Sequence, residues 1–174
     1  FVTKMGTTGS YLIYSTFIGS SNVETGINLV LGNDDSVYVA GETGSTYFPT
    51  SYYAVDKYYN GGTRDAFVLR LNSTGSALLY STFLGGQETD QANSVQVADN
   101  GNIYVTGTTN STNFPVTNTA FDGTYNGEKD AFLTVIDPDN SNLFYGTFIG
   151  GLANDDSFSL LLNDGDGAFI AGRT

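Results

Sequence analysis

The sequence predicts an all-β protein built from tandem four-stranded antiparallel blades of a β-propeller, or of a closely related stack, with about three blade equivalents. Two observations predict this fold. Three short motifs recur together at offsets of 66 and then 65 residues, and clusters of Gly, Asn and Asp separate the short apolar segments. No segment holds an apolar period of 3.6 residues over three turns, so helices are not expected.

The repeated motifs divide the chain into three copies, at about residues 1–66, 67–131 and 132–174. Because all three motifs recur at the same offsets, they belong to a single repeat array. The motifs lie at Tyr14–Gly19, Tyr80–Gly85 and Tyr145–Gly150; at Val37–Gly41, Ile103–Gly107 and Ala168–Gly172; and at Phe1–Val2, Phe67–Val68 and Phe132–Leu133.

Each copy reads as four strands joined by tight turns. In the middle copy, residues 72–75 and 99–102 supply the Asn, Asp and Gly that hairpins need at positive φ. Segments such as Phe67–Leu69 and Leu160–Leu162 are apolar on both faces, so each sheet must be covered on both sides by stacked neighbours. The four expected strands of the middle copy are Ala66–Leu71, Ala77–Leu84, Ala92–Ala98 and Ile103–Thr108.

The motifs of the middle copy resemble the SBBP repeat, the seven-bladed β-propeller repeat of bacterial and archaeal proteins. The matching segments are Tyr80–Gly86, Asp99–Gly107, Phe114–Pro115 and Asp130–Phe132. The first copy departs from the pattern, because it has Ser20 in place of the second Gly and residues 33–36 in place of Asp-x-Gly-Asn. The resemblance implies a propeller fold and a secreted or surface setting, and it implies no particular reaction.

The repeat has an unusual phase if the strand before the Asp-x-Gly-Asn turn lies innermost in each blade. The chain then starts with an outer pair of strands, Phe1–Met5 and Tyr11–Ile18, and ends with an inner pair, Ser157–Leu162 and Ala168–Gly172. The two pairs are complementary halves of one blade. We weigh two interpretations equally: the chain is an excerpt of a larger closed propeller, or its ends complete blades with neighbouring subunits in a ring or filament.

Composition excludes several function classes. Charged residues make up 14% of the chain and the formal net charge is −12, so neither nucleic acid nor an anionic membrane is an expected partner. No apolar run is long enough to span a bilayer. With no His and no Cys, nucleophilic triads, most proton shuttles and thiolate metal sites are unavailable, and we expect no enzymatic activity and no cofactor.

Acidic turns nevertheless suggest calcium as a possible ligand. Pairs of oxygen-bearing side chains two residues apart suit hard cations, although the same residues are favoured at hairpin turns in any case. None of these turns is followed by the bidentate Glu of an EF-hand loop. The candidate calcium ligands in these turns are Asp137, Asp139, Asp164 and Asp166. Asp155 and Asp156, which follow the Gly-Gly motif, are candidates in a second acidic cluster with Glu88 and Asp90.

A connection of about twenty residues between strands keeps its pattern in the first two copies, which predicts a packed segment that covers a blade edge. The first copy carries tyrosines that could stack on glycans or form contacts between subunits: Tyr52, Tyr53, Tyr58 and Tyr59, with Tyr47 nearby. Asn72 and Asn110 lie in glycosylation sequons, which would be used only if the protein is exported.

From these observations we expect a secreted or cell-surface structural glycoprotein, a scaffold or adhesion module that self-assembles, including into filaments, or forms part of a larger propeller. The alternative is a lectin-like binding module that uses the loop tyrosines and acidic turns to bind a glycan, with or without calcium.

Overall fold

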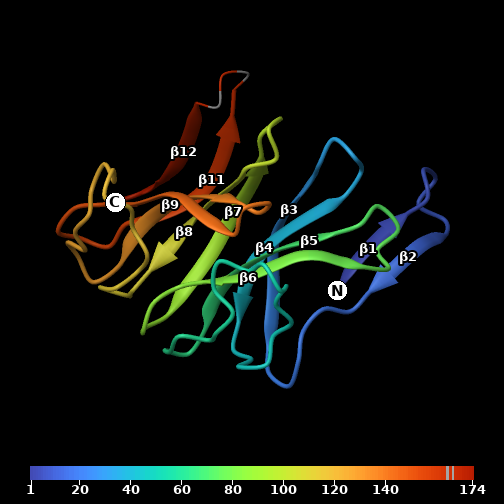
Figure 1. Ribbon diagram of the computed structural model, residues 1–174, viewed down its shortest axis with the longest axis horizontal. Helices are drawn as coiled ribbons and strands as arrows, with labels where there is room; N and C mark the ends of the chain where they lie inside the picture. The colour runs from blue at the N-terminus through green and yellow to red at the C-terminus, as the bar shows by residue number, and fades with distance from the viewer. Residues whose placement is uncertain (164, 166) are drawn as a thin grey trace.

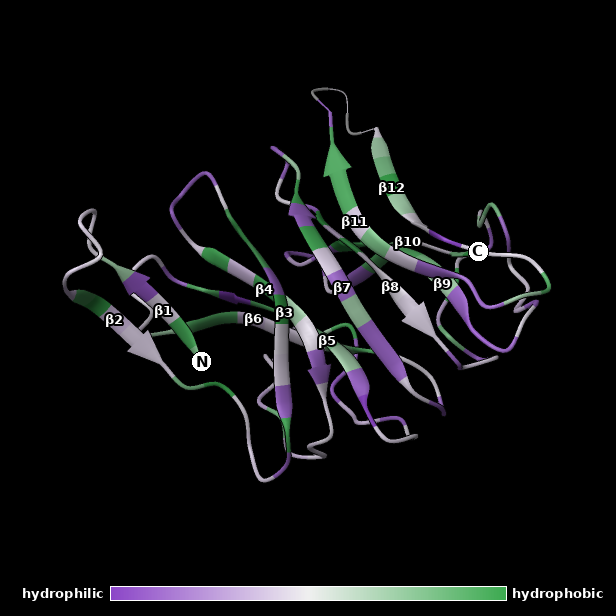
Figure 2. Ribbon diagram, turned by 180° about the vertical axis from the view of Figure 1, so that it is seen from behind, coloured by the Kyte–Doolittle hydropathy of each residue, from purple (hydrophilic) through white to green (hydrophobic). Residues whose placement is uncertain are grey.

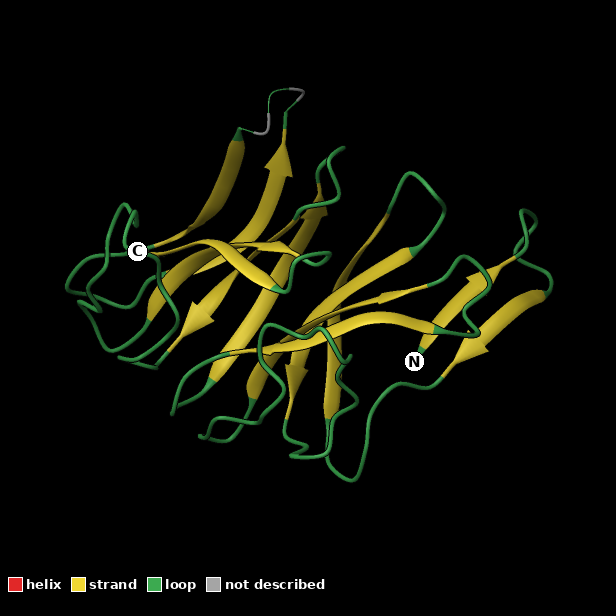
Figure 3. Cartoon of the chain, viewed as in Figure 1, coloured by secondary structure: helices red, strands yellow, loops and turns green. Residues whose placement is uncertain are grey.

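The computed structural model describes residues 1–163, 165 and 167–174. Throughout this part of the chain the regular elements are β-strands joined by turns and loops (Figure 3), which confirms the predicted all-β class. The described residues contain no helix that is long and apolar enough to cross a membrane.

Two four-stranded antiparallel sheets form the centre of the molecule (Figure 1). The first blade consists of β3 (Glu24–Leu31), β4 (Val37–Thr43), β5 (Asp65–Leu71) and β6 (Leu78–Leu84), paired in chain order. The second blade consists of β7 (Asp90–Val97), β8 (Ile103–Thr109), β9 (Asp130–Asp137) and β10 (Asn142–Ile149), again paired in chain order. The strands of the middle copy were thus predicted to within two residues at each end.

A two-stranded sheet lies at each end of this array (Figure 1). The N-terminal half-blade consists of β1 (Val2–Met5) and β2 (Leu12–Thr16), and the C-terminal half-blade of β11 (Asp156–Leu162) and β12 (Ala168–Arg173). The repeat offsets make β1 and β2 the counterparts of β5 and β6, and β11 and β12 the counterparts of β7 and β8. The structure therefore contains the counterparts of a blade's last two strands at one end of the array and those of its first two strands at the other, as the repeat offsets predict.

The sheets stack face to face, which explains why their strands are apolar on both sides. Val68 of the first blade and Val95 and Val105 of the second are completely buried in one cluster. A second cluster joins Val2 of the N-terminal half-blade to Leu69 of the first blade. Burying each such side chain stabilises the fold by about 1.5–3 kcal/mol, so the stacking of neighbouring sheets is the main source of stability.

The connecting segment 44–64, which lies between β4 and β5, is packed, as its repeated pattern predicts. The ring of Phe48 is only 4% exposed, and its centroid lies 4.6 Å from that of Phe67 and 5.8 Å from that of Phe83. Segment 110–129 repeats this arrangement in the second blade with Phe114, Phe132 and Phe148. Each aromatic trio fastens a connecting segment to the two outer strands of its own blade.

Candidate interaction sites at the half-blades and the blade junction

A glycine faces a phenylalanine between the second and third strands of each complete blade. Gly107 of β8 pairs with Phe132 of β9, and Gly41 of β4 pairs with Phe67 of β5. A Cβ on Gly107 would lie 2.8 Å from the Phe132 ring, and a Cβ on Gly41 would lie 3.0 Å from the Phe67 ring. The ring therefore occupies the space above the glycine. A residue with a Cβ in place of the glycine would clash with the ring.

The half-blades contain the two parts of this arrangement separately. Gly172 of β12 is the counterpart of Gly107, and the atoms nearest to a Cβ built on it belong to Asp156 and Ser157, with no aromatic ring among them. Phe1 is the counterpart of Phe132, and it is 85% exposed. Among the described residues, β12 is the last strand of a two-stranded sheet, so no third strand places a ring beside Gly172, while the ring type found there in the complete blades is exposed at the other end of the array.

Large apolar side chains are exposed on both end faces. Hydrophobic stretches run along the strands of both half-blades (Figure 2). The counterparts of Phe17 and Phe169 in the first blade, Phe83 and Tyr38, are 0% and 3% exposed, whereas Phe17 and Phe169 themselves are 88% and 62% exposed. The exposed apolar residues of these end faces are Leu12 and Ile13 of the N-terminal half-blade, Ile27, Leu29 and Leu31 of the neighbouring strand β3, and Phe158 and Leu161 of the C-terminal half-blade. This contrast identifies the end faces as sheet surfaces that lack a covering layer.

Buried carboxylates lie where the connections meet the first residues of strands β5, β7 and β9. Asp65 begins β5 and accepts a hydrogen bond from Asn60 N (2.5 Å), and Asp90 begins β7 and accepts one from Gly86 N (2.8 Å). The backbone N–H of Asp90 donates to the carbonyl of Arg64 in the first blade (2.9 Å). Burial raises the pKa of the Asp65 carboxyl to about 7, in spite of the hydrogen bond from Asn60, and the charge of Asp90 adds to the rise.

The same burial raises the pKa of Asp90 and of Asp130, the counterpart of Asp65 in the second blade. Asp130 accepts hydrogen bonds from Asn126 N (2.9 Å) and Gly127 N (3.2 Å). These acids therefore anchor the ends of the connecting segments at the blade edges.

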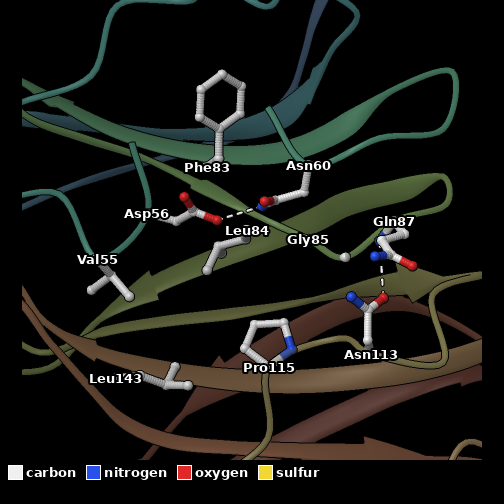
Figure 4. A pocket seen from close by; sticks show the side chains of 11 residues that line it. Val55, Asp56, Asn60, Phe83, Leu84, Gly85, Gln87, Asn113, Pro115 and Leu143 are labelled. Carbon is white, nitrogen blue, oxygen red and sulfur yellow. Dashed lines mark hydrogen bonds between the residues drawn. The ribbon is translucent and has the colours of Figure 1, made fainter. Parts of the chain in front are cut away.

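A cavity of about 360 Å³ lies at the junction of the two complete blades (Figure 4). Asp56 and Asn60 of segment 44–64 line one side, and Asn113 and Pro115 of segment 110–129 line the other. Gln87 lies in the short connection between the blades, and its backbone N–H donates to Asn113 Oδ1 (2.9 Å). Apolar side chains and polar groups thus meet in one recess, as is typical of small-molecule sites.

The tyrosines of the first connecting segment do not all share one surface role. Tyr52, Tyr53 and Tyr58 are 78%, 64% and 74% exposed, and Tyr47 is 82% exposed. Tyr52 and Tyr53 meet edge to face at 4.9 Å. Tyr59 is instead half-buried: it packs edge-on against Phe83 and donates to Gly62 O (3.1 Å). An exposed aromatic surface therefore exists, and Tyr59 belongs to the packing beneath it.

The candidate calcium ligands that lie within the described residues are not brought together into a metal site. Asp137 accepts hydrogen bonds from Asp139 N and from the backbone and side chain of Asn140, and the side-chain bond holds its pKa below the ordinary value. Asp155 accepts from Gly151 N (2.7 Å). Within residues 1–163, 165 and 167–174, no three acidic side chains are grouped closely enough to hold a metal ion. Asp164 and Asp166 lie outside the described residues.

Asp156 makes ion pairs instead, with Lys129 Nζ (2.5 Å) and Arg173 Nε (2.7 Å). Burial alone would raise the pKa of Asp156, but the bonds from these two cations outweigh it and lower the pKa. Asp156 thus connects the second blade to the C-terminal half-blade.

Both sequon asparagines use their amide groups within the fold. Asn72 Oδ1 accepts from Ser76 N (2.9 Å) and its Nδ2 donates to the Ser76 hydroxyl (3.1 Å). Asn110 Nδ2 donates to Glu128 O (2.8 Å).

Sequence reasoning missed Asp56, Gln87 and Asn113 as candidate site residues, and it missed the burial of Asp65, Asp90 and Asp130. Asp56 and Asn60 did appear in the repeated pattern of the connecting segments, and that recurrence was the available signal. Gln87 has no repeated signal, because its counterpart in the third copy is Leu152.

Comparison with known proteins agrees with this architecture. Residues 79–115 match the SBBP family, a beta-propeller repeat. The regulatory protein FlaEY of Caulobacter vibrioides is 25% identical over 163 residues, which is 94% of this chain and 17% of that protein. The chain therefore spans less than a fifth of the curated relative that it matches.

Proposed function

We propose that this chain, a protein of the SBBP β-propeller repeat family, is a non-enzymatic scaffold that joins copies of itself head to tail by completing blades between subunits. In each joint, β1 of one copy pairs with the free edge of β12 of another copy. The observation that carries the proposal is the unpaired edge of β12 beside Gly172 together with the exposed ring of Phe1. Backbone hydrogen bonds along the edge provide affinity, and the side-chain pattern provides register.

The complete blades supply the register of the joint. Gly41 pairs with Phe67 and Gly107 with Phe132, so Gly172 is expected to pair with Phe1 of the second copy. Val39 pairs with Leu69, and the same offsets place Ile170 opposite Thr3 of the second copy. A slip by one residue would turn every side chain to the opposite face, so only one register buries the apolar set.

A cation over an aromatic ring supports the same register. In the first blade the guanidinium of Arg70 lies 5.3 Å from the centre of the Tyr38 ring on the neighbouring strand. The counterparts of these residues are Lys4 and Phe169. In the joint, Lys4 of one copy is expected to lie over Phe169 of the other, a contact of about 0.5–1 kcal/mol at an exposed site.

The joint lacks one feature of the complete blades. Segments 44–64 and 110–129 contribute Phe48 and Phe114 to the aromatic trios, and a joint formed by residues 1–174 alone has no third segment of this kind. Losing an aromatic contact of this kind weakens packing by about 0.5–1.5 kcal/mol beyond the lost area. Assembly is therefore expected to be reversible and dependent on concentration.

The same proposal places the scaffold outside the cell or at the cell surface, where a repeat array of this kind would serve in structure or adhesion. The resemblance to SBBP repeats supports this setting. The absence of His and Cys supports a role without nucleophilic catalysis.

Light scattering for mass, paired with negative-stain microscopy, tests the proposal on the purified chain. We expect the mean mass to rise with concentration, and rings or filaments to appear in the images. A monomer that persists at micromolar concentration would overturn the proposal and indicate that flanking repeats complete the half-blades.

A pair of matched variants makes the test specific. Phe1→Ser removes an exposed ring that the joint needs, and we expect it to shift assembly to higher concentration by about tenfold or more, because burying a Phe contributes about 1.5–3 kcal/mol. Phe121→Ser removes a ring that is 86% exposed but lies on segment 110–129 and belongs to neither half-blade. Equal effects of the two variants would show that assembly does not use the proposed joint.

A further inference from the structure

The junction cavity between the two complete blades carries an inference that does not depend on assembly. It lies where segment 44–64, the connection between β6 and β7, and segment 110–129 meet (Figure 4). Its volume of about 360 Å³ falls within the range of about 300–1,000 Å³ that is usual for small-molecule sites. The equivalent junction beside the C-terminal half-blade has Leu152 in place of Gln87.

The polar groups of the cavity are held in place by other contacts. Asp56 Oδ1 accepts from Tyr58 N (2.9 Å), and its Oδ2 accepts from the Asn60 side chain. Asn113 Oδ1 accepts from Gln87 N, which orients the Nδ2 group of Asn113 as a remaining donor. Among the described residues, neither this Nδ2 nor the Gln87 side chain has a hydrogen-bond partner. A preorganised acceptor and two amide groups therefore line the same recess.

Apolar surface fills the space between these polar groups. Val55 and Leu84 lie on the side of the first blade, and Pro115 and Leu143 lie on the side of the second. A ligand that fits both kinds of surface needs hydroxyl groups that donate to a carboxylate and accept from amides, together with C–H faces that pack against Pro115 and the aliphatic side chains.

The charge of the site narrows the ligand class. Its lining contains a single charged group, the carboxylate of Asp56, and the whole chain has a net charge of −12, so an anion would be repelled. The lining has no second carboxylate to complete the coordination of a hard cation. We propose that the junction cavity binds one neutral sugar unit, with Asp56 accepting from its hydroxyls and Asn113 and Gln87 donating to them.

This site is distinct from the exposed tyrosines of segment 44–64. Tyr52, Tyr53 and Tyr58 do not line the cavity. A monosaccharide has few atoms, so the affinity is expected to be weak, with a Kd of about 1 mM.

NMR titration of the full chain provides the test, with glucose, N-acetylglucosamine, glucuronate and glucosamine as probes. We expect at least one of the two neutral sugars to shift the side-chain amide signals of Asn113 and Gln87 in a saturable way, and glucuronate to bind more weakly. Absence of saturable shifts at these amides with both neutral sugars would overturn the proposal, as would glucuronate binding at least as tightly as glucosamine, since the carboxylate of Asp56 favours the cation over the anion.

Two variants test the residue roles. Gln87→Leu introduces the residue that the third copy has at this position, so the fold should tolerate it, and Asp56→Ala removes the acceptor. Each is expected to weaken sugar binding, Asp56→Ala by about tenfold or more, because a hydrogen bond to a charged group contributes about 1.5–3 kcal/mol.

Asp122→Ala is the matched control. Asp122 accepts from Thr124 N (2.9 Å) and Asn126 Nδ2 (2.7 Å), as Asp56 accepts from Tyr58 and Asn60, but it does not line the cavity. Sugar affinity that falls as far in Asp122→Ala as in Asp56→Ala would show that loop order, and not the cavity, sets binding, and would overturn the assignment.

Discussion

The ring of Phe132 on β9 lies above the Cα of Gly107 on β8, 2.8 Å from the position that a Cβ would occupy. Phe67 and Gly41 repeat the arrangement in the first blade. The glycine makes room for a ring that also packs on Phe114 of the connecting segment, so one small residue allows the second strand, the third strand and the loop to meet. In the half-blades, Gly172 and Phe1 hold the equivalent positions. Among the described residues, no third strand pairs with β12 beside Gly172, and the ring of Phe1 is 85% exposed.

Gly107→Ala is expected to lower the free energy of unfolding by about 3 kcal/mol or more, because the added Cβ meets both the Phe132 ring and the backbone carbonyl of Gln91. Urea unfolding followed by tyrosine fluorescence measures the change. Gly123→Ala is the control, since no atom lies within 4 Å of a Cβ at that position. Equal stability of Gly107→Ala and the wild-type protein would show that the ring and the glycine do not fit together as described.

Asp65→Asn is expected to stabilise the protein at pH 8 and to have little effect at pH 4. The folded-state pKa of Asp65 is about 7, above its ordinary value of 3.8, so the folded state holds the proton more tightly than the unfolded state. Stability from this group is therefore present below about pH 4 and is lost as the pH rises through 7. The gain for Asn at pH 8 is of the order of 4 kcal/mol at most, from 1.36 kcal/mol per pKa unit.

Thermal unfolding between pH 4 and pH 8 measures this dependence. Asp139→Asn, at an exposed turn position, is the control for the removal of one negative charge. If Asp65→Asn stabilises the protein no more at pH 8 than at pH 4, relative to the wild-type protein, the result would contradict the burial of an ionised Asp65 at pH 8.

Asp35→Gly is expected to raise the free energy of unfolding by about 0.5–1 kcal/mol, since Asp35 adopts a positive φ of 59° in the β3–β4 turn. The second blade has Gly101, with φ 87°, at the equivalent position. The reciprocal change Gly101→Ala should lower stability by about 1 kcal/mol, because its Cβ meets no atom and only the backbone is strained. Chemical denaturation of both variants checks the pair, and changes of the same sign would contradict this explanation.

Removal of calcium is expected to leave the melting midpoint unchanged. The oxygens of Asp137 accept three hydrogen bonds from its own turn, and those of Asp156 pair with Lys129 and Arg173, so neither carboxylate is available to a cation without losing these bonds. Melting curves with calcium and with chelator test this. A midpoint that rises with calcium would indicate a site that uses other residues.

The repeat made the strands and the half-blades predictable from sequence. Strand positions followed from the offsets of Tyr14, Tyr80 and Tyr145, because equivalent residues of a repeat must occupy equivalent places. The junction cavity could not be predicted in this way. Asp56, Gln87 and Asn113 come from three separate segments, and their side chains carry no pattern that distinguishes them from other loop residues.

The buried acids illustrate a second limit. Asp65 and Asp130 were recognised only as part of a repeated motif, because an Asp at the start of a strand resembles any turn residue. Their burial depends on the neighbouring sheet and on the return of segments 44–64 and 110–129 over the blade edge. Such tertiary contacts are not encoded in local spacing.

A disulfide designed into the joint tests the central claim most directly. The chain has no Cys, so Thr3→Cys with Ile170→Cys introduces one thiol on each side of the expected pairing. Paired residues of antiparallel strands have Cα atoms about 4.5–5.5 Å apart, within disulfide reach. In Thr3→Cys with Ala168→Cys, the partner is displaced by two residues, about 7 Å along the strand, and lies out of reach.

After mild oxidation, the two double variants are compared by non-reducing electrophoresis. The variant that combines Thr3→Cys with Ile170→Cys should show a ladder of covalent dimers and higher oligomers, and the variant that combines Thr3→Cys with Ala168→Cys should remain monomeric. A ladder of equal strength for both variants, or monomers for both, would contradict completion of the blade between subunits in the register of Gly172 and Phe1.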